Sequence, residues 1–242
     1  DDVTLVAKKD VRIRQSDIGS EKGNVLIGSQ QGDIQVEAGR EEEQLASASK
    51  SVSRGRFGLS KTTEIRRHEH DIAQSVGSNI DGKTVNLIAG QGNVTVQGSN
   101  VVGENGLTVQ AKNIDIKEAE NKVYSEDFHS KKKSGVLGGG LGVTFGAQKQ
   151  TLESDKTKFY AQGSQVGSLN GNTTLIAKNH YTQTASQVSA VNGDVNILAK
   201  NVDIKAADDK YETNTKQTFE QKGVSLAVTS PILSALQAVQ GT

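Results

Sequence analysis

The residues most able to do chemistry gather in the segment Arg66–Asp71, which reads Arg-Arg-His-Glu-His-Asp. If this segment is a β-strand, His68 and His70 point to the same side and, with Asp71, resemble part of a metal site. A structural zinc site normally needs four ligands, and the whole chain has only four histidines and no cysteine. Close histidines in a charged segment are usually solvated side chains, so we expect no metal site here.

A run of glycines, Gly138–Gly140, is the second candidate, because glycine-rich loops can cradle phosphate groups. The spacing G-x-G-x-x-G does not fit, since Val143 and Phe145 stand where glycines are needed. The pattern G-x-x-x-x-G-K-[ST] does not occur either. The sequence therefore predicts no nucleotide cofactor, and no other cofactor is indicated.

Composition limits the remaining possibilities. Lys plus Arg equals Asp plus Glu at 28 each in 242 residues, so no net field attracts nucleic acid or anionic lipid. Only 33% of the residues are hydrophobic and 4% aromatic, with 26 glycines and one proline. This composition favours an elongated protein with a narrow core. Because the chain has no methionine, we expect a segment of a longer protein, with a processed chain as the alternative.

The chain repeats itself at long range. The phrase AKNIDIKEAENKVYS, which starts at Ala111, returns as AKNVDIKAADDKYET from Ala199, 88 positions later. Leu87-Ile88-Ala89 returns at the same interval as Leu175-Ile176-Ala177, and a weaker copy stands at Val3–Ala7. A structural unit that packs on a copy of itself explains such repetition better than a catalytic loop does. We predict a single segment, 1–242, with modules of roughly 1–81, 82–170 and 171–230.

A shorter period of 22 positions separates Ala89 from Ala111 and Ala177 from Ala199. Between these alanines lie short runs that alternate apolar and polar residues, which indicates strands with one buried face. Turn residues such as Asn105-Gly106 separate the runs, and hairpins are a possible reading of that pair. A period near 20 with several strands per round favours a solenoid instead. The predicted fold class is all-β, a right-handed parallel β-helix.

Three excursions interrupt the regular pattern, at about 41–79, 121–168 and 211–230. Each is rich in Lys, Ser, Thr and Glu, with an apolar, glycine-bearing centre that follows basic residues. We expect pairs of long strands that leave the helix and return to it, and ordinary surface loops are the alternative. Seven apolar side chains in these centres are candidate membrane or partner contacts, namely Phe57, Leu59, Val136, Leu137, Leu141, Val143 and Phe145.

The C-terminal end has another character, because Gly223–Thr242 contains no charged residue. Ser230-Pro231 resembles a helix start, with a capping residue followed by proline at the first helical position. A helix over 231–240 would place Ile232, Leu233, Leu236 and Val239 on one side. We expect this short helix to cap the solenoid, with a membrane segment as the alternative.

The coil pattern resembles the haemagglutinin repeats of filamentous-haemagglutinin-like exoproteins. It occurs here as GDVNILAKNVDI from Gly193 and as GLTVQAKNIDI from Gly106. The glycine-rich interruptions are similar to the second repeat region of contact-dependent growth-inhibition effectors. This resemblance implies a rod-like β-helix in a very large protein, secreted to the bacterial cell surface by an outer-membrane two-partner-secretion transporter. It also implies a target-cell receptor or outer membrane as a partner, and a role in virulence.

Three functions follow as expectations. The first is a non-enzymatic segment that serves adhesion and toxin delivery into neighbouring bacteria. The second is a pure adhesin that binds host glycans or receptors. The third is a polysaccharide-degrading β-helix enzyme, which would need a distinct acid-base pair. Asp115 and Asp203 occupy equivalent places in two modules, which fits a repeated corner better than one active site. We therefore expect no catalytic residues and no nucleic-acid partner.

Overall fold

The computed structural model describes residues 1–55, 58–139 and 142–227, with the side chains of 138–139, 142–144 and 225–227 left out. Within these ranges the regular elements are β-strands, as predicted. A search of the same residues finds no helix with the length and apolarity to cross a membrane. The predicted helix over 231–240 lies outside the described residues.

The chain forms two compact units. The solenoid unit comprises Asp1–Glu43, Ile72–Val123 and Lys158–Tyr211. The sheet unit comprises Gln44–Asp71, Tyr124–Thr157 and, of the described residues, 212–227. Long strands run from one unit into the other, so each unit draws on separate parts of the sequence.

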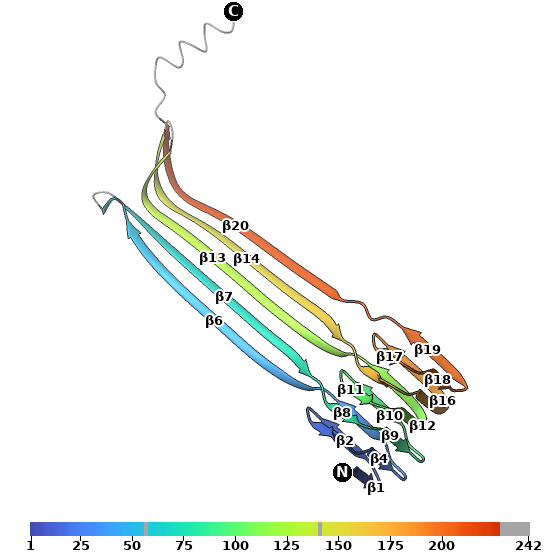
Figure 1. Cartoon of the computed structure of the whole chain (residues 1–242). Helices are drawn as coiled ribbons and strands as arrows, with labels where there is room; N and C mark the ends of the chain where they lie inside the picture. The colour runs from blue at the N-terminus through green and yellow to red at the C-terminus, as the bar shows by residue number, and fades with distance from the viewer. Residues whose placement is uncertain (56–57, 140–141, 228–242) are drawn as a thin grey trace, which may run out of the picture. The chain divides into compact units, whose positions relative to one another are not determined.

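Six successive coils build the solenoid unit, with up to three strand positions in each coil (Figure 1). In coils 4 and 5, one continuous strand covers the first two positions. The strands are β1 (Val3–Ala7), β2 (Val11–Arg14) and β3 (Asp17–Gly19) in coil 1; β4 (Val25–Ser29), β5 (Ile34–Glu37) and β8 (Asn79–Gly82) in coil 2; β9 (Val85–Ala89), β10 (Val94–Gln97) and β11 (Asn100–Gly103) in coil 3; β12 (Leu107–Lys117) and β15 (Gln165–Ser168) in coil 4; β16 (Thr173–Thr184) and β17 (Gln187–Ala190) in coil 5; β18 (Val195–Leu198) and β19 (Asn201–Lys205) in coil 6.

Neighbouring coils pair in parallel, and the register follows the predicted period. Val85 pairs with Leu107, and Thr173 with Val195, each 22 positions on. Ala111 pairs directly with Ala177. Like positions of successive rounds therefore stack on one another, which confirms the predicted parallel β-helix.

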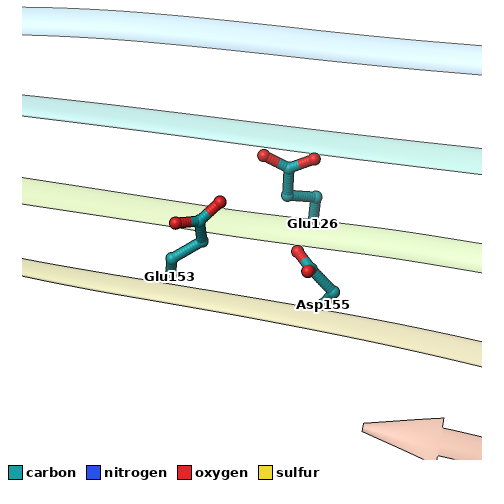
Figure 2. Close-up of side chains that lie close together, drawn as sticks. All are labelled: Glu126, Glu153 and Asp155. Carbon is teal, nitrogen blue, oxygen red and sulfur yellow. The ribbon is translucent and has the colours of Figure 1, made fainter. Parts of the chain in front are cut away.

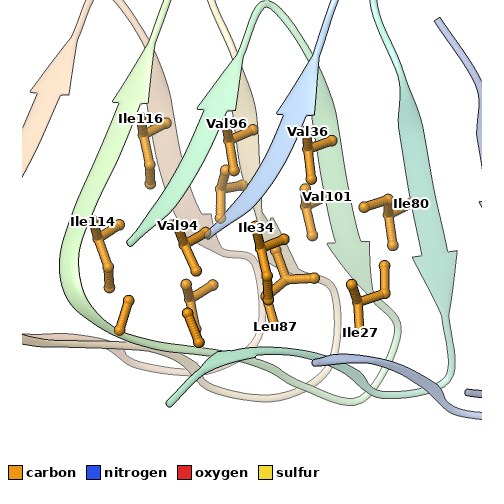
Figure 3. Packing of buried hydrophobic residues seen from close by; sticks show 14 of the residues in the cluster. Ile27, Ile34, Val36, Ile80, Leu87, Val94, Val96, Val101, Ile114 and Ile116 are labelled. Carbon is orange, nitrogen blue, oxygen red and sulfur yellow. The ribbon is translucent and has the colours of Figure 1, made fainter. Parts of the chain in front are cut away.

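Apolar ladders fill the interior of the coils (Figure 3). Val94 stacks between Ile34 and Ile114, while Val96 two positions on stacks between Val36 and Ile116. The side chains of Val94 and Val96 are buried, whereas Thr95 between them faces outwards, as the alternation of a strand requires. Full burial of such a side chain stabilises the fold by about 1.5–3 kcal/mol. The narrow core explains how a chain so poor in aromatic residues folds.

A polar ladder follows the bend between the first two strands of successive coils. The carboxylate of Asp33 accepts the backbone N–H of Asn93 at 2.7 Å, and the side-chain carbonyl of Asn93 accepts from the amide of Asn113 at 2.7 Å. The side-chain carbonyl of Asn113 then accepts the backbone N–H of His180 at 3.2 Å. Two of these bonds satisfy backbone N–H groups at the bend, and the bond between Asn113 and Asn93 links side chains of neighbouring coils.

The excursions form one five-stranded sheet, in the order β20-β14-β13-β7-β6. Hairpin 1 consists of β6 (Gly39–Arg54) and β7 (Ser60–Val76), and hairpin 2 of β13 (Ala119–Gly139) and β14 (Gly142–Gln162). Adjacent strands run in opposite directions in Figure 1. The predicted strand pairs are thus confirmed for the first two excursions, whose bounds begin and end a few residues before the predicted ones. For the third, the description covers one strand, β20 (Lys210–Ala227).

Each described hairpin belongs to one pair of coils, since hairpin 1 interrupts coil 2 and hairpin 2 interrupts coil 4. Strands in a sheet lie about 4.8 Å apart. Two coils and one hairpin therefore add the same width, about 9.6 Å, to their respective sheets.

Candidate functional site

The described residues among the predicted membrane or partner contacts lie near the ends of the hairpin strands. The backbone N–H of Val136 donates to the carbonyl of Leu59 at 2.9 Å, so the end of β13 is adjacent to the start of β7. Leu137 follows near the end of β13, and Phe145 stands near the start of β14. Phe57 and Leu141 lie outside the described residues, and of Val143 only the backbone, in β14, is described.

These side chains form an exposed apolar end of the sheet unit, which we call the apolar tip. Leu59 is 60% exposed and Phe145 is 51% exposed, while Val136 and Leu137 are half-buried. The backbone of Gly223 lies against the carbonyl of Phe145, which brings β20 to the same end. Val224 beside it is 68% exposed. The sequence marked the stretch around Val224 as apolar, although Val224 itself was not among the predicted contacts.

The rings of His68 and His70 stack with centroids 6.2 Å apart, as expected for side chains on one side of a strand. Neither histidine belongs to the acidic cluster that is the candidate cation site of the described residues. Instead Nδ1 of His68 lies 2.6 Å from a carboxylate oxygen of Asp127 on the neighbouring strand, and Nε2 of His129 lies 2.7 Å from Glu64. These are cross-strand pairs that stabilise the sheet. A shallow groove is lined by His68, Asp127 and His129 together with Ser47, Ala48, Ser49, Arg66, Arg67 and Phe128.

An acidic cluster on the sheet unit is the feature that sequence reasoning missed (Figure 2). One carboxylate oxygen from each of Glu126, Glu153 and Asp155 lies within 4.8 Å of the others. The cluster forms because β13 pairs with β14, a contact with no local signal in the sequence. Carboxylate oxygens are the ligands that Ca²⁺ and Mg²⁺ prefer, so this is where the described residues could hold a cation.

Hydrogen bonding distinguishes the members of the acidic cluster. The hydroxyl of Tyr124 donates to Glu126 at 2.8 Å. This hydrogen bond is the main cause, and burial the second, that raises the pKa of Tyr124 to about 12. Tyr124 therefore stays protonated and remains a donor at neutral pH. Oδ1 of Asp155 is shielded from solvent and makes no hydrogen bond. Like charges this close destabilise a sheet unless a cation or proton neutralises them.

The outward acids of the solenoid unit show a repeat rather than an active site. Asp115 and Asp203 both pair with Thr182, from opposite sides, so they occupy one position in coils 4 and 6. Each carboxylate faces the lysine two residues later, at 3.3 Å for Lys117 and 3.6 Å for Lys205. The repeated acid–lysine pair is what equivalent corners of two modules would contain.

Comparison with known proteins agrees with this architecture. The family model described as "Hemagglutinin repeat" matches residues 58–220, about two thirds of the chain. That range covers the second strand of hairpin 1, all of hairpin 2, and coils 3 to 6. None of the solved structures gives a significant match to the chain.

Several curated relatives are similar to the chain. It is 33% identical over 188 residues to a tRNA nuclease CdiA of Yersinia mollaretii, covering 75% of this chain and 6% of the relative. A 16S rRNA endonuclease CdiA of Enterobacter cloacae is 36% identical over 156 residues, covering 60% and 5%. A deoxyribonuclease CdiA of Yersinia pseudotuberculosis is 31% identical over 153 residues, covering 62% and 14%.

The chain thus spans a small fraction of these relatives, which carry three different nuclease names. What they share with it is the repeat pattern and not one activity. The extent of the family match, together with the stacked coils, confirms the resemblance that the sequence carries. This chain belongs to the hemagglutinin repeat family.

Proposed function

We propose that this chain is a non-enzymatic repeat segment of a large secreted exoprotein on the bacterial cell surface. In this role it serves adhesion to neighbouring bacteria and delivery of a toxin into them. Support comes from the similarity to the CdiA proteins, whose nuclease names differ while the repeat segment is shared. A segment common to effectors with different nucleases suits a delivery role better than a catalytic one.

The single observation that carries the proposal is the apolar tip. Soluble proteins rarely gather exposed apolar side chains without a partner for them. Leu59, Phe145 and Val224 are each more than half exposed, and they come from three different parts of the chain. We propose that the apolar tip contacts the outer membrane or a surface receptor of the target cell.

The solenoid unit has a different part in this proposal. Its coils join through backbone hydrogen bonds and apolar ladders, so each coil offers the next a template. Folding of successive coils outside the secreting cell would favour outward movement through an outer-membrane two-partner-secretion transporter. The hairpins, by contrast, would supply the specific contacts.

The test is a double substitution at the tip, Leu59→Asp with Phe145→Asp, in the full-length effector. We expect secretion and folding to be unchanged and growth inhibition of target cells to fall at least about tenfold. Leu45→Asp is the matched control, because Leu45 lies on the same sheet and is also 60% exposed. It should leave inhibition intact.

Two outcomes of this test would overturn the proposal. Full inhibition by the double variant would show that the apolar tip is not needed for delivery. Loss of inhibition with Leu45→Asp as well would show that any charge on the sheet has the same effect. If the double variant inhibits normally and the chain binds host glycans or receptor protein by itself, the segment is a pure adhesin.

A further inference from the structure

Serines form a ladder through the solenoid unit at the residue that precedes the third strand of coils 1 to 5, and those of coils 2 to 4 are buried. The backbone N–H of Ser78 donates to Oγ of Ser99 at 3.0 Å. The N–H of Ser99 in turn donates to Oγ of Ser164 at 3.1 Å, and that of Ser164 to Oγ of Ser186 at 3.0 Å. Ser16 begins the series by donating to Ser78 at 3.2 Å. One serine from each of coils 1 to 5 thus takes part.

Each serine also closes its own coil, by donating its hydroxyl to a carbonyl at the end of the second strand. In coil 3 the acceptor is Gln97, two residues before Ser99, at 2.9 Å. In coil 2 the acceptor of Ser78 is Glu37, 41 residues before it, at 2.8 Å. Coil 4 resembles coil 2, since Ser164 donates to Lys117, 47 residues before it, at 2.8 Å. The same bond therefore closes coils with and without a hairpin.

One residue makes the corner in the coils that carry no hairpin. Gln15, Gly98 and Ala185 each stand alone between the second strand and the ladder serine. All three have positive φ, at 47°, 55° and 44°, which is the left-handed conformation of a tight corner. Non-glycine residues rarely adopt it, so its recurrence at one position in coils 1, 3 and 5 marks a structural requirement.

The strands on both sides of the corner keep their register whether or not a hairpin intervenes. Before the corner, Glu37 pairs with both Arg14 and Gln97. After the corner, Asn100 pairs with both Asn79 and Gln165. A hairpin of about forty residues thus enters the coil without displacing the strands that flank it.

The base of each hairpin is fitted to the corner of the next coil. Both hairpin segments end in glycine followed by the ladder serine, as Gly77-Ser78 and Gly163-Ser164. A Cβ on Gly77 would stand 2.5 Å from the carbonyl oxygen of Gly98, and one on Gly163 would collide with the carbonyl of Ala185. Only glycine allows this approach.

We infer that the hairpins are exchangeable contact elements, each inserted at the one position where other coils place a single left-handed residue. The serine ladder closes the solenoid beneath them. The solenoid then folds without a given hairpin, and contact specificity can change by replacing a hairpin while the coils stay the same. This inference concerns how the contact elements are attached, and it holds whatever the apolar tip binds.

The main test replaces residues 38–77 with one glycine, so that Glu37-Gly-Ser78 copies Gln97-Gly98-Ser99. We expect a soluble protein in which the amides of β4, β5, β9 and β10 keep their hydrogen-exchange protection within about threefold. Loss of that protection, or an insoluble product, would overturn the inference.

A register control joins Glu37 directly to Ser78, which leaves no corner residue. A one-residue change turns inward side chains outward, so we expect β8 to lose its exchange protection by at least about tenfold. Equal protection in the directly joined and glycine-bridged variants would contradict a single-residue corner.

A third measurement leaves the hairpins in place. Ser78→Ala and Ser99→Ala remove the same ladder hydroxyl with and without a hairpin, and both serines are fully buried. We expect Ser78→Ala to accelerate exchange at the hairpin 1 base, at Ala38 and Ser75, about tenfold more than Ser99→Ala does. Equal acceleration would show that Ser78 does not hold the base.

The same glycine-bridged variant separates this inference from the proposed function. If it folds but delivery continues unchanged, hairpin 1 is attached as inferred, whereas its role as a contact element, which rests on the proposed function, is refuted. If it does not fold, the inference fails while the tip substitutions still test delivery.

Discussion

The two units use the same β geometry and differ in where their stability comes from. The buried apolar cluster lies entirely within the solenoid unit, where side chains such as Leu87 and Ile114 are shielded on all sides. In the sheet unit the large apolar side chains that are exposed include Leu45, Leu152 and Phe219. Stability there rests on the backbone ladder and on cross-strand pairs of charged and aromatic residues.

Arg67 and His68 show how those pairs work on the two faces of the sheet unit. Arg67 lies over the ring of Phe128 at 5.3 Å, and His68 contacts Asp127 on the neighbouring strand. Exposed pairs of this kind contribute about 0.2–1 kcal/mol each. A coil therefore tolerates little change inside, whereas a hairpin can vary its surface freely, which suits an element that makes specific contacts.

The largest expected effect compares one leucine from each unit. Leu87→Ala removes a fully buried side chain from the apolar ladder and should destabilise the solenoid unit by about 2–5 kcal/mol. Leu45→Ala should change stability by less than about 0.5 kcal/mol, because Leu45 is exposed. Hydrogen exchange of each unit in urea measures both. Equal losses of stability in the two variants would show that the sheet unit has an apolar core of its own, contrary to this comparison.

A smaller effect is expected at the acidic cluster. Asp155→Asn removes one of three crowded charges and should stabilise the sheet unit by about 0.2–1 kcal/mol when a chelator excludes cations. Asp127→Asn is the matched control, since it removes the partner of His68 and should destabilise the same strands. Stabilisation by Asp127→Asn as well would show that the effect is one of net charge.

The smallest effect concerns pH. Hydrogen bonds from Arg66 and then His129 hold the pKa of Glu64 below its usual 4.5. A carboxyl with a lowered folded pKa contributes stability that is present above the unfolded value and is lost as pH falls through the folded value. Between about pH 6 and about pH 3, the sheet unit of wild type should therefore lose slightly more exchange protection than that of Glu64→Gln. A larger loss of exchange protection in Glu64→Gln than in wild type would show that ionised Glu64 does not stabilise the sheet unit.

Much of the solenoid unit follows from the chain read by itself. The 22-residue interval, the alternation around Val94 and Val96, and the polar bend residues are all local signals. They predicted the stacking of like positions that the register of Val85 with Leu107 confirms. The corner was also visible, since Gly77, Gly98 and Gly163 each precede a serine. That these glycines and serines occupy one corner of successive coils became clear only from the hydrogen bonds that link the serines.

The sheet unit was foreseen only in outline. The excursions read as strand pairs, but nothing local indicates that β7 lies beside β13 or that β14 lies beside β20. The contact between Leu59 and Val136 depends on that order, and so does the exposed apolar tip. The acidic cluster joins residues of two strands whose register is set across a hairpin of more than forty residues.

The sequence by itself determined that consecutive rounds stack. Short strands that repeat at a fixed period, each with one apolar face, bury those faces by stacking on one another. Only the tertiary structure decided which hairpins lie side by side and which charges meet. The physical reason is that pairing between hairpins depends on where each one leaves the solenoid. That spacing is set by the number of coils between Glu37 and Lys117, and no single stretch of sequence contains it.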